Sequence, residues 1–539
     1  MRSGARALVE SLEKAGAEVV FGYPGGNVID IFDCVRTAKF RFVLGRHEQG
    51  CVHMADGYAR ALGRPGVVLV TSGPGLTNAI TGLGAANMDG VPLVLICGQV
   101  PLGDIGTDAF QEADTTGLTR AVSKHNFLVK SADEIPETIA QAFHIATSGK
   151  PGVVVIDVPR DCQRAHTAAP YPARVSLRAY HPERFASPAQ VNRLARLVNA
   201  AKRPVIYAGG GVIAAEASAD VVALAHKAGM PVVTTMMGIG TIDSEDRLSL
   251  GMAGIYGEPA ARRALAGADL VLALGVRFND RTADELPRRQ WPRIVHVDCD
   301  ASAIGRNVQP GFGIVADVKD LLATVDSRIR PATRGEWVAR CRPTEAELSA
   351  AARSAESRPG YVPPKAVVDA VCRAAGESLV AVTDVGQHQL WAARFLRRVR
   401  PRSFISSGGM GAMGFGIPAA IGAAIARPGM KVVAFVGDGG AQMTAEELAV
   451  AAELGLPIVF VVFANGALGL VRQMQSEDFG SRYFATELVS PDFVKLASAY
   501  GVKGVRVDDP ARLGSAVSRA MRAKGPVLIE VKTDPEAKA

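Results

Sequence analysis

The sequence predicts an α/β protein made of three doubly wound domains, each built on a parallel sheet. Short apolar runs alternate with helix-like patterns along most of the 539 residues, and uninterrupted apolar strands are typical of parallel sheets covered by helices on both faces. Two stretches rich in Pro and Arg, at about 163–187 and 328–364, lack this periodicity. We expect them to be linkers, the second with room for a short helix, which places the domains at 1–162, 188–327 and 365–532.

The expected strands are apolar runs bounded by glycine, proline or polar residues, as buried strands are. In chain order they cover residues 67–70, 93–96, 153–158, 205–207, 270–274, 294–297, 432–436, 458–463 and 527–531.

The first and third domains are expected to be distant copies of one another. Residues 67–96 and 432–461 both follow the order strand, glycine turn, helix, Gly-x-Pro, strand, and the offset between them stays at 365. Chance similarity of two ordinary α/β units is the alternative. Because an internal repeat constrains the whole architecture, we predict two similar outer domains and a Rossmann-like middle domain.

Composition limits the class of protein. The net charge of +7 could indicate a polyanionic partner, but Lys and Arg are scattered and no long basic run occurs. We therefore favour an enzyme that binds anionic cofactors and expect no nucleic-acid partner. The seven dispersed cysteines form no CxxC pair, which favours a reducing compartment. No signal-peptide pattern or membrane-length apolar run is present, so we expect a cytoplasmic protein that binds no membrane.

Two neighbouring strand ends in the third domain carry oxygen ligands. Gly437-Asp438-Gly439 ends one expected strand, and Asn465 ends the next, 27 positions later. A carboxylate, an amide oxygen and a nearby carbonyl suit Mg²⁺, which would hold a diphosphate cradled by glycine N–H groups. The alternative is an ordinary turn Asp and turn Asn.

The middle domain has a weaker ligand signal. Gly209-Gly210-Gly211 follows a strand but lacks a full GxGxxG pattern. Asp298 and Asp317 follow strand ends, where open α/β sheets bind ligands, and each could contact a ribose or adenine. As isolated surface carboxylates they would carry no function.

These motifs resemble those of thiamine-diphosphate enzymes. The Gly437–Gly439 segment with Asn465 looks like their metal–diphosphate motif, except that Ala464 replaces the first residue of an Asn pair. The main-chain carbonyl of Ala467 matches the family's third metal ligand. Residues 45–50 look like the segment that carries the activating glutamate, which is Glu48 here; taken alone, Glu48 would be an ordinary solvated helix start.

Within that superfamily the chain is most similar to the large catalytic subunit of acetohydroxyacid (acetolactate) synthases, over about residues 4–532. The similar segments are 23–26, 46–49, 71–75, 98–101, 105–112, 124–127, 237–238, 275–281, 386–389, 411–416 and 468–471. The resemblance implies pyruvate decarboxylation on thiamine diphosphate, then condensation with a second 2-keto acid in branched-chain amino-acid biosynthesis. It also implies bound Mg²⁺ and a FAD without net redox role.

The resemblance assigns roles position by position. Catalytic positions are Glu48, Gln111, Lys124 and Gly26, and substrate positions are Phe110, Arg281 and Met474. Thiamine-diphosphate positions are Tyr23, Pro74, Asn78, Val385, Gly386, Gln387, His388, Gly411, Met413, Gly437, Asp438, Gly439, Gly440, Asn465, Ala467, Leu468 and Gly469, with Asp438, Asn465 and Ala467 as metal ligands. FAD positions are Gly209, Gly210, Gly211, Thr235, Met236, Met237, Gly254, Arg277, Arg281, Asp298 and Asp317.

Some positions depart from the family pattern. Asn27 stands where Ala is common, Tyr256 replaces a His, Met474 replaces a Trp that favours 2-ketobutyrate, and Gly440 replaces a common Ser. The tail after the last strand is short, ending at Ala539. Asn27 and the short tail leave open a flavin-dependent oxidase, or a decarboxylase or carboligase acting on another 2-keto acid. A non-enzymatic cofactor-binding paralogue is a third reading.

The resemblance also implies an assembly. We expect a homodimer or tetramer in which Glu48 of one subunit meets Asp438 of another, and a small regulatory subunit is a further possible partner.

Overall fold

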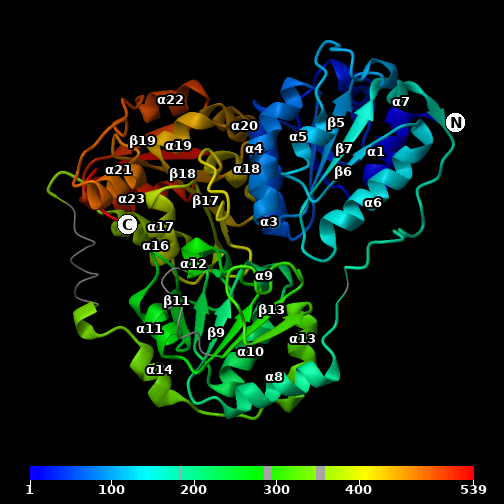
Figure 1. Ribbon diagram of the computed structural model, residues 1–539. Helices are drawn as coiled ribbons and strands as arrows, with labels where there is room; N and C mark the ends of the chain where they lie inside the picture. Colours follow the sequence, from blue (N-terminus) through cyan, green and yellow to red (C-terminus); the bar gives the residue numbers. More distant parts are fainter. Residues whose placement is uncertain (183, 284–292, 348–357) are drawn as a thin grey trace.

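The computed structural model describes residues 1–182, 184–283, 293–347 and 358–539. These residues form three six-stranded sheets and one two-stranded pair, β1 (Arg2–Ser3) with β8 (His166–Thr167). Figure 1 shows three blocks, in which the first (blue to cyan) and third (yellow to red) lie side by side above the middle block (green). The predicted class, three parallel α/β units, is confirmed.

The first block is a parallel sheet with strand order β3-β2-β4-β5-β7-β6. Its strands are β2 (Val19–Gly22), β3 (Arg41–Leu44), β4 (Gly66–Val70), β5 (Leu93–Gln99), β6 (His125–Leu128) and β7 (Val153–Pro159). Its helices are α1 (Gly4–Lys14), α2 (Ile29–Val35), α3 (Glu48–Leu62), α4 (Pro74–Met88), α5 (Thr115–Thr119), α6 (Ile135–Thr147) and α7 (Arg160–Arg164). Apolar clusters fill both faces of the sheet, which explains its uninterrupted apolar strands.

The third block repeats this topology, with strand order β16-β15-β17-β18-β20-β19. Its strands are β15 (Leu379–Thr383), β16 (Phe404–Ser406), β17 (Lys431–Gly437), β18 (Ile458–Ala464), β19 (Lys503–Val507) and β20 (Val527–Lys532). Its helices are α16 (Pro364–Ala375), α17 (Gln387–Phe395), α18 (Gly416–Ala426), α19 (Asp438–Met443), α20 (Leu448–Glu453), α21 (Gly469–Asp478), α22 (Phe493–Ala499) and α23 (Pro510–Ala520). β4 and β17 begin 365 residues apart, as do β5 and β18, so the predicted repeat is confirmed.

The middle block has the strand order β11-β10-β9-β12-β13-β14, which is the Rossmann order. Its strands are β9 (Pro204–Ala208), β10 (Val232–Thr234), β11 (Ser249–Met252), β12 (Leu270–Leu274), β13 (Arg293–Asp298) and β14 (Phe312–Val315). Its helices are α8 (Pro188–Ala200), α9 (Gly210–Ala214), α10 (Ser218–Ala228), α11 (Pro259–Gly267), α12 (Asp280–Ala283), α13 (Val318–Val325) and α14 (Gly335–Cys341).

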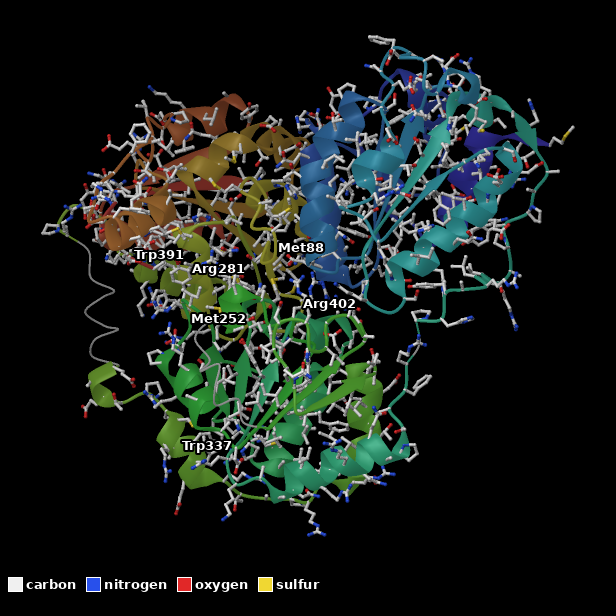
Figure 2. All side chains as sticks on the ribbon, viewed as in Figure 1. Met88, Met252, Arg281, Trp337, Trp391 and Arg402 are labelled. Atoms are coloured by element: carbon white, nitrogen blue, oxygen red, sulfur yellow. The ribbon has the colours of Figure 1, made fainter. Side chains whose placement is uncertain are left out.

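Helix α14 lies in the second stretch that the sequence marks as a linker. Trp337 of this helix is buried, and its indole N–H donates to the carbonyl of Pro204 at 3.1 Å. Buried Trp and a hydrogen-bonded indole indicate real packing. Part of this stretch therefore packs on the middle block, and Figure 2 shows Trp337 at the end of that block farthest from the other two.

The first and third blocks meet where α3 crosses α18 (Figure 1). A side chain at Gly57 would collide with the backbone of Ala419, and one at Gly422 would collide with the backbone of Met54. These glycines allow close approach of the two backbones. The crossing places the start of α3, and with it Glu48, beside the third block. Within the described ranges, no helix is both long and apolar enough to span a bilayer.

Candidate active site

Glu48 is the first residue of α3 and is 8% exposed. The side chain of His47 caps this helix by accepting the N–H of Gln49. The Asn78 side chain, from α4, donates to Glu48 Oε2 at 2.9 Å. Gly75 lies beside the other oxygen, because a Cβ at that position would be 3.5 Å from Glu48 Oε1. The carboxyl is thus held between two helix starts, with the Asn78 amide as a polar partner.

Three loops meet near Glu48 at the carboxyl ends of the first sheet's strands. Gln111 has a left-handed backbone (φ 61°) that packs against Gly73, and its Oε1 faces Gly26. Pro74 opens α4 at the end of the same turn. The amide of Asn27 donates to Ser72 Oγ at 2.7 Å. The polar group at this departure from the family pattern therefore links two of the loops.

Two aromatic side chains stand out from these loops. Tyr23 is 38% exposed and Phe110 is 88% exposed. Phe110 is therefore almost uncovered and Tyr23 is partly uncovered, close in sequence to Gln111 and Gly26 respectively.

The side chain of Lys124 does not point to the loops around Glu48 in this structure. Its Nζ donates to the carbonyls of Ile145 and Ser148 at 2.6 and 2.7 Å and lies over the ring of Tyr180. Helix C-termini leave carbonyls without partners and attract cations, so Lys124 here binds the end of α6. A role at the keto-acid position would require its side chain to turn.

Asp438 and Asn465 occupy adjacent strand ends, because β17 and β18 are hydrogen-bonded neighbours. Asp438 is 2% exposed, and its carboxylate accepts N–H groups of Gly439 (2.9 Å), Asn465 (3.2 Å) and Gly466 (2.7 Å). The Asn465 amide oxygen accepts the N–H of Ala467 at 3.1 Å. Burial raises the pKa of Asp438 above its ordinary value, and a bound cation would oppose that shift.

Two buried side chains beside this corner have polar atoms without partners in the described part of the chain. They are His388 Nε2 and Gln387 Oε1. Burial lowers the pKa of His388 to about 3, so its imidazole is neutral and can donate one hydrogen bond. A Cβ at Gly437 or Gly386 would lie within 2.9 Å of the imidazole. Unsatisfied buried groups are costly, and an anionic ligand entering this glycine-lined corner would satisfy the imidazole.

Gly439 forms the floor of a small apolar niche. A Cβ there would lie 2.8 Å from Leu468 and 3.3 Å from Met413. Gly469 is equally confined, since a side chain would collide with Gln387, and Gly411 (φ 69°) faces Val385. Met413 therefore stands over the Gly437–Gly440 turn.

Asp384 is a functional candidate that the sequence reasoning missed. It is fully buried at the end of β15, and its carboxylate accepts the N–H groups of Val385 (2.8 Å), Gly414 (3.1 Å) and Gly416 (2.8 Å). Burial raises its pKa to about 6. It joins the segment carrying Gly386–His388 to the one carrying Met413. Its place directly after an apolar strand, like that of Asp438, was the available signal.

A cavity of about 730 Å³ lies where the middle block approaches the other two, a size suited to a cofactor. Figure 2 shows Met88, Met252 and Arg281 in this region. Its lining includes every expected FAD position except Gly209, together with Tyr256, Val385, Gly411 and Met474. Gly209 lies behind the lining, where a side chain would collide with Gly275.

The two acidic FAD positions differ in their surroundings. Asp298 is 8% exposed and burial raises its pKa. Asp317 caps α13 by accepting the N–H groups of Lys319 and Asp320 at 2.8 and 3.2 Å. A carboxylate that already caps a helix has a structural reason to be there, so Asp298 is the stronger ligand candidate.

Comparisons with known proteins agree with this geometry. Residues 2–118, 191–325 and 384–531 match the N-terminal TPP binding, central and C-terminal TPP binding domains of thiamine pyrophosphate enzymes. The chain belongs to this family of enzymes, in its acetolactate synthase branch. It is 44% identical to the acetolactate synthase large subunit of Mycobacterium tuberculosis over 98% of this chain and 87% of that protein. It is 41% identical to the large subunit of Haemophilus influenzae (99% and 94%) and 40% identical to the mitochondrial catalytic subunit of Saccharomyces cerevisiae (99% and 81%).

Proposed function

We propose that the protein is the catalytic subunit of an acetolactate synthase, which decarboxylates pyruvate and joins the remaining two-carbon unit to a second 2-keto acid. The observation that supports this proposal most directly is the pair of buried carboxyl sites, Glu48 with Asn78 in the first block and Asp438 with Asn465 in the third. The named relatives support the choice of reaction.

Glu48 would take part in proton transfer with the cofactor. Bound thiamine diphosphate supplies a nucleophilic carbanion and a thiazolium ring that serves as the electron sink for decarboxylation. The Glu48 carboxyl, withdrawn from water and held by Asn78, would hold a proton at the aminopyrimidine ring. Gly26 and Gln111 would face the reacting carbonyl, because the loops that carry them meet next to this carboxyl.

The diphosphate end would be held by the third block. Asp438, Asn465 and the Ala467 carbonyl would bind Mg²⁺, a cation that prefers oxygen ligands. His388, whose free Nε2 lies beside this corner, would donate to the diphosphate together with the N–H groups of the Gly437–Gly440 turn, next to Gln387. Met413, which lies over Gly439, would pack against the bound cofactor.

FAD would occupy the cavity of the middle block. Its volume and its glycine-rich wall, with Thr235 and Arg277 beside it, support this assignment. Arg281, Phe110 and Met474 would shape the route of the second keto acid, where Met474 allows pyruvate as well as 2-ketobutyrate.

We also propose a homodimer or tetramer with the active site between subunits, located in the cytoplasm. The exposed Tyr23 and Phe110 around the Glu48 loops support a covering partner surface. Mixing Glu48→Ala with Asp438→Ala chains under subunit exchange should restore activity, and no recovery would contradict a shared site. Some relatives are named large subunits, which supports a small-subunit partner.

The first test of function supplies the purified protein with thiamine diphosphate, Mg²⁺, FAD and pyruvate and assays acetolactate. Acetolactate that is formed by the wild type and lost in Glu48→Gln supports the reaction and the activator together. Cofactor binding without acetolactate would favour another 2-keto acid, and net flavin reduction would favour an oxidase.

A further inference from the structure

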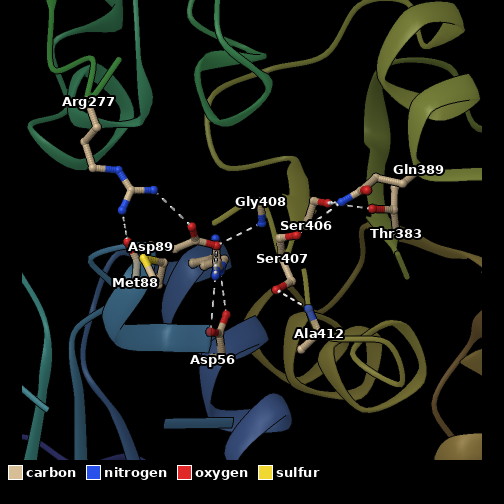
Figure 3. Close-up of polar contacts among 11 residues, drawn as sticks. Asp56, Met88, Asp89, Arg277, Thr383, Gln389, Ser406, Ser407, Gly408 and Ala412 are labelled. Carbon is tan, nitrogen blue, oxygen red and sulfur yellow. Dashed lines mark hydrogen bonds and ion pairs between the residues drawn. The ribbon is translucent and has the colours of Figure 1, made fainter. Parts of the chain in front are cut away.

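The three blocks meet at one buried carboxylate, Asp89, at the C-terminal end of α4 (Figure 3). Its side chain is 0% exposed. Arg60 Nη2 of the first block lies 2.9 Å from Oδ2, and the N–H of Gly408 in the third block donates to the same oxygen at 3.0 Å. Arg277 Nη2 of the middle block lies 3.5 Å from Oδ1. Asp89 is thus a polar contact common to all three blocks.

The charges around Asp89 are matched only when Arg277 is in place. Arg60 is shared with a second buried carboxylate, Asp56, at 2.5 Å. Two carboxylates therefore face Arg60, and Arg277 supplies the second cation. The other end of the Arg277 guanidinium donates to the carbonyl of Met88. A planar fork that reaches two acceptors fixes the direction of the side chain.

Both carboxylate oxygens of Asp89 contact residues that belong to, or adjoin, proposed cofactor positions. Arg277 lines the cavity proposed for FAD. Gly408 begins the segment that continues to Gly411 and Met413, the proposed thiamine platform. The Ser407 hydroxyl accepts the N–H of Ala412 at 3.1 Å, and the Gln389 amide donates to Ser406 Oγ at 2.7 Å. The platform segment is therefore fastened on one side by Gln389 and on the other by Asp89 (Figure 3).

The contact is also tightly packed. A Cβ at Gly409 would lie 2.5 Å from Met88, 2.6 Å from Asp89 Oδ1 and 3.1 Å from Arg277 Nη2. The platform segment therefore lies directly against the Asp89–Arg277 pair.

We propose that Asp89 is a positioning residue that couples FAD binding in the middle block to thiamine-diphosphate binding on the platform of the third. The inference rests on the proposed function, which provides both ligands. An FAD that contacts Arg277 in this position stabilises its pairing with Asp89, which holds Gly408 and hence the platform. Coupling between two sites is reciprocal, so each cofactor raises the affinity for the other by the same factor.

The experiment measures the dissociation constant of thiamine diphosphate, with Mg²⁺, in the presence and absence of FAD, and that of FAD with and without thiamine diphosphate. For each cofactor, the ratio is its dissociation constant without the other cofactor divided by its dissociation constant with it. For the wild type we expect the two ratios to agree, within the roughly 5- to 150-fold range of such couplings. Asp89→Asn keeps the side-chain size and loses the charge. We expect its ratios to fall toward 1 while each cofactor still binds. The control, Asp326→Asn, removes an exposed ion pair with Lys227 and should keep the wild-type ratios.

Arg277→Lys is the second variant, in case Asp89→Asn does not fold. A lysine keeps the cation but lacks the fork, so the ratio should fall here too. Both cofactors binding to the wild type with ratios of 1, or a folded Asp89→Asn that keeps the wild-type ratio, would overturn the coupling and leave the proposed function intact. A wild type that binds neither cofactor would overturn both.

Discussion

The carboxylate of Glu447 accepts the backbone N–H of His47 at 3.1 Å, one residue before Glu48. Both its oxygens also lie 3.1 Å from the N–H of Arg46. Glu447 is fully buried, belongs to the third block and packs so closely on α3 that a side chain at Gly50 would collide with it. One block of the chain therefore holds in place the loop that carries the other block's candidate activator.

We predict that loss of the contact between Glu447 and the Glu48 loop lowers the activity. Glu447→Ala frees two N–H groups beside Glu48, and a misplacement of about 1 Å can cost on the order of 100-fold in rate. We expect kcat to fall by roughly that factor with little change in KM, measured by acetolactate formation. Glu447→Gln retains one acceptor and should lose less. Equal losses in both variants, or a change in KM alone, would contradict the positioning role.

The second prediction concerns pH and stability. Burial raises the pKa of Glu447 from 4.5 to about 7, so the folded protein binds a proton that the unfolded chain has released between these values. The stability linked to this proton is complete below pH 4.5 and is lost as the pH rises through 7. Relative to Glu447→Gln, the wild type should lose at most about 3 kcal/mol over this window. Urea unfolding of both at pH 5 and pH 8 measures the difference, and parallel profiles would refute it.

The third prediction concerns the metal. Asp438→Asn replaces the one carboxylate of the proposed ligand set, and Mg²⁺ binds mainly through carboxylates and phosphates. We expect thiamine-diphosphate affinity to fall at least tenfold and EDTA to produce a similar loss in the wild type. Titration calorimetry measures both. The matched variant Asp369→Asn removes a helical ion pair with Lys365 and should bind like the wild type, whereas unchanged binding in Asp438→Asn would exclude this metal site.

The fourth prediction concerns the crossing of α3 and α18. Gly422→Ala would place a methyl group against the backbone of Met54, and overpacking of this kind costs about 1–3 kcal/mol. Gly514→Ala, on the exposed face of α23, meets nothing within 4 Å and should stabilise by up to about 1 kcal/mol. Thermal unfolding distinguishes the two, and a stable Gly422→Ala would show that the helices can separate without loss.

The sequence was sufficient where the signal is local or periodic. The offset of 365 was read from glycine and proline turns, and the strands β17 and β18 that it implies are neighbours. Their adjacency is what brings Asp438 to Asn465. In both cases an apolar strand and the residue directly after it carry the information, and parallel sheets align such ends at one edge.

The missed residues share a different property. Asp384 and Glu447 are buried acids whose partners are backbone N–H groups, in Glu447 some 400 positions away. Asp89 accepts one backbone N–H, from Gly408, and pairs with Arg60 and Arg277, which are also distant in the sequence. Almost any residue type supplies a backbone N–H, so a sequence pattern does not indicate which residue will donate to a buried acid. Lys124 shows the same limit for a side-chain donor. Its ammonium group binds backbone carbonyls at the end of α6, and the sequence does not indicate that contact.

The α3–α18 crossing pairs two equivalent helices. Shifted by the offset of 365, α18 falls on residues 51–61, within α3, so equivalent helices of the two repeats face each other as in a symmetric dimer. Here the two partners are joined through the middle block. Their association is intramolecular and does not weaken on dilution. Each activator half is therefore always accompanied by one diphosphate half, in fixed 1:1 ratio, at any concentration of the protein.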